Sequence, residues 1–275
     1  MNRRYRLARA LLAGMLLGLS LETAAGAETY AGPPAVAIHS EKVQYALVQG
    51  QSVYGYLSKP TQAQGAQPGV ILIHMWWGLN QHMRDVADRL ARQGYVVLAV
   101  DLYNGRSTRD PRVAAQLMDI ASANTSALLS NLEQAVSYMS LQQHVNHLGV
   151  IGWSVGGHWA FQIASDLPQA FDALAVFYTA PYTEPSQLTT LRMPILAFFG
   201  ERDPFVPQAV VDKFQWAAEL ASAQVTIHVY PDALPTFDDP DSTAYNSRDA
   251  QDAWQQLDAF LLLNLKGSKL TAASG

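Results

Sequence analysis

Short apolar runs alternate with longer amphipathic stretches along most of this chain. The apolar runs are bounded by glycine, proline or polar residues and cover residues 70–74, 96–100, 148–151, 173–178, 195–199 and 225–229. Helical periodicity is seen at 82–92, across 113–139 as one or two helices, and at 244–265 as a final helix. Strands that are apolar at every position are typical of a parallel sheet buried on both faces. The pattern therefore predicts an α/β protein with a mostly parallel, twisted sheet and helices on both faces.

Two segments before the first of these runs have a different pattern. Residues 43–48 and 52–57 are rich in valine, leucine and tyrosine, and Gly50-Gln51 lies between them. Segments of this composition on either side of a glycine-containing turn predict an antiparallel hairpin. We expect this hairpin at the edge of the sheet.

The composition is that of one globular domain. The chain has 275 residues, of which 49% are hydrophobic and 15% charged, and no repeat or low-complexity linker interrupts it. We expect a single domain over 42–266, an extended leader over 28–41 and a frayed polar tail over 267–275. The formal net charge of -5 provides no basic surface, which excludes nucleic acid as a partner.

Cysteine is absent, and this limits the possible chemistry. Disulfides, thiolate metal sites and a cysteine nucleophile are all excluded. The seven histidines show no metal-ligand spacing, so no metal or cofactor is expected. We expect a monomer that acts on a small molecule.

The N-terminus has the pattern of an export signal. A basic start is followed by an apolar run at 10–21 and by the small residues Ala25-Gly26-Ala27, which predicts a cleavable signal peptide over 1–27. The apolar run is shorter than the roughly 20 residues that cross a bilayer, so a membrane anchor is disfavoured. Arg3-Arg4 matches a twin-arginine signal poorly. The mature protein is therefore expected to start near Glu28, free of the membrane, in the periplasm or outside the cell.

The sequence Gly152-Trp153-Ser154-Val155-Gly156 matches the G-x-S-x-G motif of a nucleophile on a sharp turn. It directly follows the apolar run 148–151, and a helix-compatible stretch at 158–164 comes after it. A helix that begins at the nucleophile directs its amides and its dipole toward developing negative charge. A glycine-rich turn with an N-capping serine is the alternative. The strand–turn–helix context favours Ser154 as a nucleophile.

Four further segments give the chain a resemblance to one family, the dienelactone hydrolases. Residues 73–80 are similar to the H-E-x-x-G-L-N segment of that family, and 94–103 resemble the strand and loop that follow it. Residues 200–204 resemble the loop that carries the catalytic acid, and 245–254 resemble the opening of the last helix. The resemblance runs from about Lys42 to Leu265. It implies an α/β-hydrolase fold.

The resemblance also implies roles for individual residues. Ser154 occupies the nucleophile position, where family members usually have cysteine. Asp203 is implied as the acid that orients an imidazole, with a turn-capping aspartate before Pro204 as the alternative. The oxyanion hole is implied to consist of the backbone amides of Trp76 and Val155.

Two positions depart from the family pattern. The histidine of the triad belongs in a loop resembling Y-P-G-A-x-H-x-F, and in this chain Pro235 stands at its position. Met75 stands where the family has a glutamate. Proline has no titratable group and takes no proton from a serine hydroxyl.

The histidines of this chain are poorly placed to replace the missing base. His74 ends the strand next to the nucleophile strand and is the one candidate for a substitute base, although such a residue is more often a hydrogen-bonded scaffold. His228 lies inside the last predicted strand, and His158 lies one helical turn beyond Ser154. The others are expected at the surface; they are His39, His82, His144 and His147.

These features support two main hypotheses about function. The first is a hydrolase that cleaves an ester or lactone through a Ser154 acyl-enzyme. The second is a catalytically impaired relative that keeps the pocket as a small-molecule binding module, because of Pro235 and Met75. A purely structural or adhesive role has no supporting feature beyond the predicted export.

Overall fold

The computed structural model describes residues 36–62 and 65–272, with side chains up to residue 267. The predicted signal peptide at 1–27 and most of the predicted leader lie outside the described residues, so export stays a prediction from the sequence. Within the described ranges, no helix is long and apolar enough to cross a membrane.

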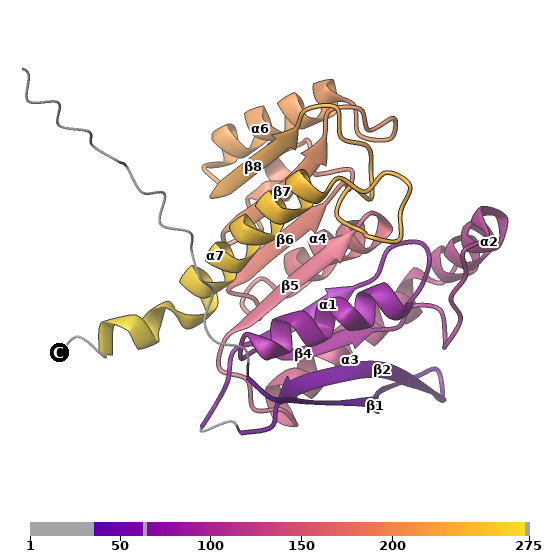
Figure 1. The fold of residues 1–275 in the computed structure, drawn as a ribbon, viewed down its shortest axis with the longest axis vertical. Helices are drawn as coiled ribbons and strands as arrows, with labels where there is room; N and C mark the ends of the chain where they lie inside the picture. The colour runs from indigo at the N-terminus through magenta and orange to yellow at the C-terminus, as the bar shows by residue number, and fades with distance from the viewer. Residues whose placement is uncertain (1–35, 63–64, 273–275) are drawn as a thin grey trace, which may run out of the picture. The chain divides into compact units, whose positions relative to one another are not determined.

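The described residues form an α/β fold around one sheet of eight strands (Figure 1). The strand order is β1-β2-β4-β3-β5-β6-β7-β8. The strands are β1 (Ile38–Val48), β2 (Gln51–Pro60), β3 (Gly69–Ile73), β4 (Val96–Val100), β5 (Leu148–Trp153), β6 (Ala173–Phe177), β7 (Ile195–Gly200) and β8 (Val225–Tyr230). The pairs β1–β2 and β2–β4 are antiparallel, and all other pairs are parallel. The mostly parallel sheet and its antiparallel edge hairpin are confirmed.

The hairpin is longer than its residue pattern predicts. β1 starts at Ile38, inside the segment expected as an extended leader, and pairs with β2 as far as Pro60. The extra pairs include Ser40 opposite Ser58, whose hydroxyls hydrogen-bond at 2.8 Å. Polar residues that hydrogen-bond across the two strands can extend a strand beyond its run of hydrophobic residues. Prediction from hydrophobic runs alone therefore ends the strand too early. The leader therefore ends before Ile38 rather than at residue 41.

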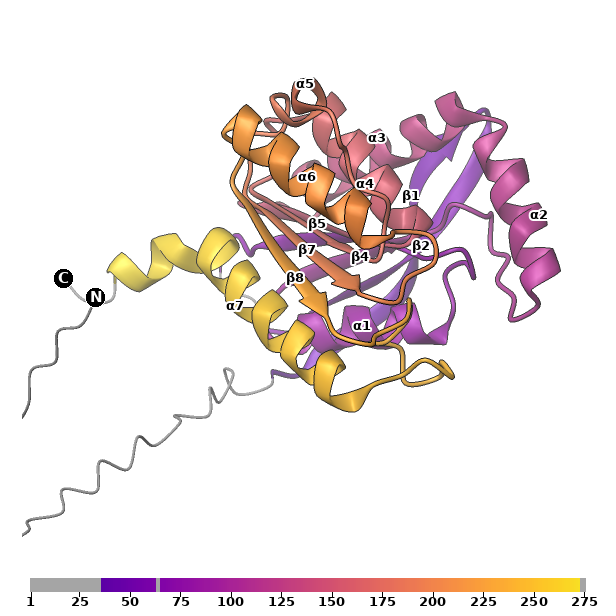
Figure 2. The same cartoon turned by 90° about the horizontal axis from the view of Figure 1, so that it is seen from above.

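Helices cover both faces of the sheet (Figure 2). Helices α1 (Gln81–Arg92) and α7 (Ser247–Ala272) lie on one face, and α3 (Thr125–Leu141), α4 (Val155–Asp166) and α6 (Gln208–Ala221) lie on the other. The predicted helical stretch at 113–139 divides into α2 (Pro111–Ser122) and α3, and the short α5 (Pro185–Leu188) precedes β7. α7 continues to Ala272, so the tail predicted from residue 267 is helical for most of its length.

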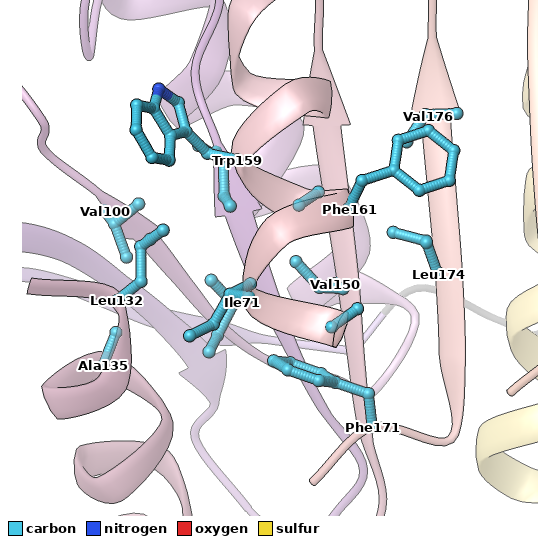
Figure 3. Close-up of a cluster of buried hydrophobic side chains, with 14 of the residues drawn as sticks. Ile71, Val100, Leu132, Ala135, Val150, Trp159, Phe161, Phe171, Leu174 and Val176 are labelled. Atoms are coloured by element: carbon cyan, nitrogen blue, oxygen red, sulfur yellow. The ribbon is translucent and has the colours of Figure 1, made fainter. Parts of the chain in front are cut away.

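Two hydrophobic clusters hold these layers together, one on each face of the sheet. On the α3/α4 face, Ile71, Val150 and Leu174 project from neighbouring strands toward the aromatic side chains of α4 and the loop after it (Figure 3). On the α1/α7 face, Ile151 and Trp153 of β5 join the second cluster. Because β5 is buried on both faces, the position of the residue that follows it is fixed by the core.

Candidate active site

Ser154 lies on a sharp turn between β5 and α4. Its backbone has φ 54 and ψ -121, a left-handed φ that non-glycine residues rarely adopt. The Ser154 N–H donates to Phe177 O at 2.9 Å, and its carbonyl accepts from Gly157 N at 2.9 Å. Strained backbone of this kind costs about 1–3 kcal/mol and persists where the surroundings hold it. The turn, called the elbow below, thus has the strand–turn–helix geometry that the G-x-S-x-G motif predicts.

The glycines of the motif are required by close backbone packing. A Cβ on Gly152 would lie 2.3 Å from Gly156 O, and a Cβ on Gly156 would lie 2.3 Å from Ile73 O. A Cβ on Gly157 would lie 2.6 Å from Cγ2 of Thr179. No other residue has room at these three positions, which explains the G-x-S-x-G-G spacing.

The loop after β3 is in contact with the elbow, because β3 and β5 are neighbours in the sheet. Trp76 and Trp77 lie in this loop with ring centroids 4.5 Å apart. Among the described residues, the backbone N–H groups of Trp76 and Val155 donate to no main-chain carbonyl of a turn, loop or helix cap. The two amides that the family resemblance implies as oxyanion donors are therefore on segments in contact with each other next to Ser154.

Met75 and His74 belong to the scaffold of this loop. Met75 is fully buried in the apolar cluster of the α1/α7 face. His74 is also fully buried; its Nδ1 donates to Met75 O at 2.7 Å, and its Nε2 accepts from Leu102 N at 3.1 Å. Burial lowers the pKa of His74. With both nitrogens hydrogen-bonded to the main chain, His74 has the scaffold role, and the substitute-base role is not supported.

Asp203 follows β7 and is buried, with 4% of its surface exposed. Its Oδ1 accepts from Phe205 N at 2.7 Å and from Val206 N at 3.1 Å, which is the turn-capping role. Its Oδ2 is buried and has no hydrogen-bond partner among the described residues. Burial raises the pKa of this carboxyl group. One oxygen of Asp203 thus holds the turn, and the other is available.

The loop with Pro235 is attached directly to the Asp203 segment. Arg202 N donates to Ala233 O at 3.0 Å, and Glu201 N donates to Tyr230 O at 3.0 Å. A Cβ on Gly200 would lie 2.4 Å from Ala233 O, so the two backbones are in close contact. Pro235 is half-buried in this loop. The side chain of proline has no hydrogen-bonding group, so Pro235 forms no hydrogen bond with Asp203.

The described residues supply no histidine to Ser154. Its hydroxyl forms no hydrogen bond with any side chain of the described part. His158 is exposed on α4 and packs edge-on against Trp159, while the ring of His228 on β8 stacks on Phe198 at 5.5 Å. Partial loss of contact with water lowers the pKa of both imidazoles. Among the described residues, no group of three or more histidine, aspartate or glutamate side chains is arranged to hold a metal ion.

A buried group of ionisable residues beside the elbow was not predicted. His82, expected at the surface, is largely buried, and its Nδ1 lies 3.4 Å from Asp239 Oδ1. The sequence gives little sign of this, because His82 and Asp239 are 157 positions apart. His82 is therefore a buried partner of Asp239, and the surface prediction is wrong.

Asp238 fixes both sides of the elbow. Its Oδ2 accepts from Trp153 Nε1 at 2.9 Å, and its Oδ1 accepts from Tyr178 Oη at 2.9 Å. Trp153 directly precedes Ser154, and Tyr178 directly follows Phe177, whose carbonyl binds the Ser154 N–H. Burial raises the pKa of Asp238. The loop after β8 is thus joined to the ends of β5 and β6 by one carboxyl group.

Replacing Asp238 with alanine is expected to lower the free energy of unfolding by about 1–3 kcal/mol. Alanine has no acceptor, so the Trp153 indole and the Tyr178 hydroxyl both lose their partner in a buried site. Urea unfolding followed by tryptophan fluorescence measures the change. Asp241→Ala is the matched control in the same loop, because Asp241 is exposed and its carboxylate pairs with exposed Arg109; its effect should stay below about 0.5 kcal/mol. Equal effects of the two variants would contradict the bridging role of Asp238.

Comparisons with known proteins agree with this geometry. A family model described as "Dienelactone hydrolase family" matches residues 53–263. An Escherichia coli protein named "Putative carboxymethylenebutenolidase" is 30% identical over 223 residues, which are 76% of this chain and 82% of that protein. A protein of the same name from Synechocystis sp. is 30% identical over 237 residues, covering 79% and 94%. The solved structure titled "Putative Dienelactone Hydrolase" from Klebsiella pneumoniae has a TM-score of 0.73 at 25% identity, covering 82% of this chain and 98% of that one.

Proposed function

The chain belongs to the dienelactone hydrolase family, and we propose that it hydrolyses a carboxylic ester or lactone through an acyl-enzyme on Ser154. The family and the solved relatives support a hydrolase function. The observation that carries the proposal is the backbone of Ser154, held at φ 54 at the start of α4 and in contact with the loop after β3. A turn of this shape presents the serine hydroxyl above the sheet.

The first chemical step is attack of Ser154 Oγ on the carbonyl carbon of the substrate. The carbonyl oxygen becomes an oxyanion and accepts hydrogen bonds from the amides of Trp76 and Val155, each of which contributes about 3 kcal/mol to the transition state. The C–O bond to the leaving alcohol then breaks, and the alkoxide takes a proton. Water later attacks the acyl group and releases the acid, which returns the hydroxyl to Ser154.

The proton of Ser154 has no imidazole to receive it. Serine proteases that lose one triad member keep about 10³ to 10⁴-fold acceleration over water, through the oxyanion hole and substrate binding. We therefore assign this chain slow hydrolysis with the proton passing to water. Asp203 keeps the position of the triad acid, with Oδ2 as its available oxygen.

Labelling with a fluorophosphonate tests the nucleophile directly. The native protein is expected to gain the mass of one phosphonyl adduct, and peptide mapping should place it on Ser154. Ser154→Ala is expected to gain none, while Ser165→Ala, which removes another serine hydroxyl of α4, should label as the native protein does. An unlabelled native protein, or one labelled elsewhere, would contradict the acyl-enzyme.

The second candidate function is a binding module that keeps the fold and has lost catalysis. Pro235, Met75 and the unpaired Oδ2 of Asp203 favour it, because the site has the acid of a triad and no base to orient. The same labelling experiment separates the two functions, since a site without a reactive hydroxyl forms no adduct.

A further inference from the structure

The leaving group of an ester lies next to the imidazole position of a serine hydrolase, because the imidazole that takes the serine proton later donates it to the leaving group. In this chain Pro235, in the loop after β8, stands at that position. The loop is joined to the Asp203 segment by the Arg202 N–H, which donates to Ala233 O at 3.0 Å. The leaving group is therefore expected between the loops after β7 and β8.

The residues at this position offer no proton to a leaving oxygen. Leu234 and Pro235 have no titratable group. The Thr236 hydroxyl is paired with Ser242 Oγ at 2.6 Å. Asp203 has a buried oxygen without a partner among the described residues, but a carboxyl group is normally ionised near pH 7 and then accepts protons. The leaving oxygen consequently departs as an anion.

The basicity of that anion decides whether acylation is completed. The phenol group of tyrosine has a pKa of about 10, whereas water, an acid about as weak as an alkyl alcohol, has one of about 15.7. The tetrahedral intermediate on Ser154 therefore expels a phenoxide more easily than the serine oxygen. An alkoxide leaves no more easily than the serine oxygen, so the intermediate formed from an alkyl ester largely returns to the starting ester.

Exposed apolar side chains flank the same position. Leu234, which directly precedes Pro235, is 42% exposed. Phe205 is 83% exposed, and its N–H donates to Asp203 Oδ1 at 2.7 Å, which holds it beside the acid. An aromatic ring is stabilised where it removes such apolar surface from water. The leaving-group side of the site thus suits a group that is both acidic and apolar.

We propose that this chain is selective for aryl esters of carboxylic acids, whose leaving group is a phenol. Ser154 Oγ forms a bond to the acyl carbon, the bond from that carbon to the aryl oxygen breaks, and phenoxide leaves while the serine proton passes to water. A second water then releases the carboxylic acid and restores the hydroxyl of Ser154. The proposal rests on the acyl-enzyme proposed above and adds the class of leaving group.

Phenyl acetate and benzyl acetate form a matched pair of substrates, with the same acyl group and one ring each. We expect kcat/KM of the native protein to be at least about 10²-fold higher for phenyl acetate, because a positioned general acid contributes about 10² to 10⁴-fold and only benzyl acetate needs one. Pro235→His supplies a donor and should bring the two substrates within about 10-fold of each other. Thermal unfolding of every variant shows whether it is folded.

The contribution of the ring is measured with trifluoroethyl acetate, whose leaving group is acidic but small. Phe205→Ser is expected to lower the ratio of kcat/KM for phenyl acetate to that for trifluoroethyl acetate by about 5-fold, through loss of apolar contact. Leu220→Ser is the control, because Leu220 is a 59% exposed apolar residue of α6, and it should leave this ratio unchanged.

The outcomes separate this proposal from the acyl-enzyme itself. If fluorophosphonate labels Ser154 and the native protein cleaves benzyl acetate within about 10-fold of phenyl acetate, a proton donor is present and the proposal is overturned. Since burial raises the pKa of Asp203, Asp203→Asn shows whether that donor is Asp203. An unchanged ratio in folded Phe205→Ser would overturn the preference for a ring. If Ser154 is not labelled and Ser154→Ala cleaves phenyl acetate as the native protein does, the acyl-enzyme is wrong as well.

Discussion

Pro235→His is expected to raise the turnover of a simple ester such as p-nitrophenyl acetate by about 10² to 10⁴-fold, the usual contribution of a positioned general base. The backbone that would carry the imidazole is already attached to the Asp203 segment through Ala233. Asp203 Oδ2, buried and unpaired, is available to accept the Nδ1–H of the imidazole, which leaves Nε2 free to take the proton of Ser154. The substitution thus supplies the base that the proposed Ser154 site lacks.

The pH dependence identifies the new base. In Pro235→His, kcat/KM is expected to fall below about pH 6.5, where an imidazole is protonated and takes no proton from serine. Leu234→His is the matched control, because Leu234 is the exposed neighbour in the same loop. Adding Asp203→Asn to Pro235→His should remove most of the gain, since the imidazole then loses its orienting carboxylate.

Two results would contradict this account. If Leu234→His raised turnover as much as Pro235→His, the gain would not depend on the triad position. If the native protein were already fast and Pro235→His changed nothing, another base would exist, and the impaired binding module would be wrong.

Most of the sheet and the elbow were predictable from the sequence because short-range rules dictate them. Buried parallel strands are apolar at every position, so β3 to β7 stand out as runs. The elbow is predictable because its glycines are imposed by contacts within a few residues of Ser154 and with Ile73 on the neighbouring strand. Asp203 and Pro235 follow from their places after β7 and β8.

Features that depend on distant side chains were not predictable. The bridge from Asp238 to Trp153 and Tyr178 joins residues 85 and 60 positions apart, and neither end has a distinctive pattern. α6 was missed although it buries Val211 and Phe214, because the exposed apolar residues Trp216 and Leu220 blur its helical period. The unpaired oxygen of Asp203 and the unpaired hydroxyl of Tyr103 appear only when neighbours are placed in space.

Gly156→Ala is expected to disturb the elbow and the loop after β3 together. The added Cβ would lie 2.3 Å from Ile73 O and 2.5 Å from His74 O, both main-chain atoms of β3 and the loop after it. Because the backbone cannot rotate away as a side chain can, the elbow and that loop must separate. Overpacking of this kind costs about 1–3 kcal/mol or more of the free energy of unfolding.

The same separation should affect the chemistry more than the stability. The loop displaced by Gly156→Ala carries the Trp76 amide, and a displacement of about 1 Å in a catalytic group can reduce a rate about 10²-fold. Fluorophosphonate labelling of Ser154 is therefore expected to slow by about that factor at a temperature where the variant is still folded. Gly267→Ala is the control, since no atom lies within 4 Å of its added Cβ. Alanine is more favourable than glycine in a helix by about 1 kcal/mol, so this variant should stabilise α7. Labelling of Ser154 should stay unchanged. Native labelling kinetics in Gly156→Ala would mean that the contact between the elbow and the loop after β3 does not set the reactivity of Ser154.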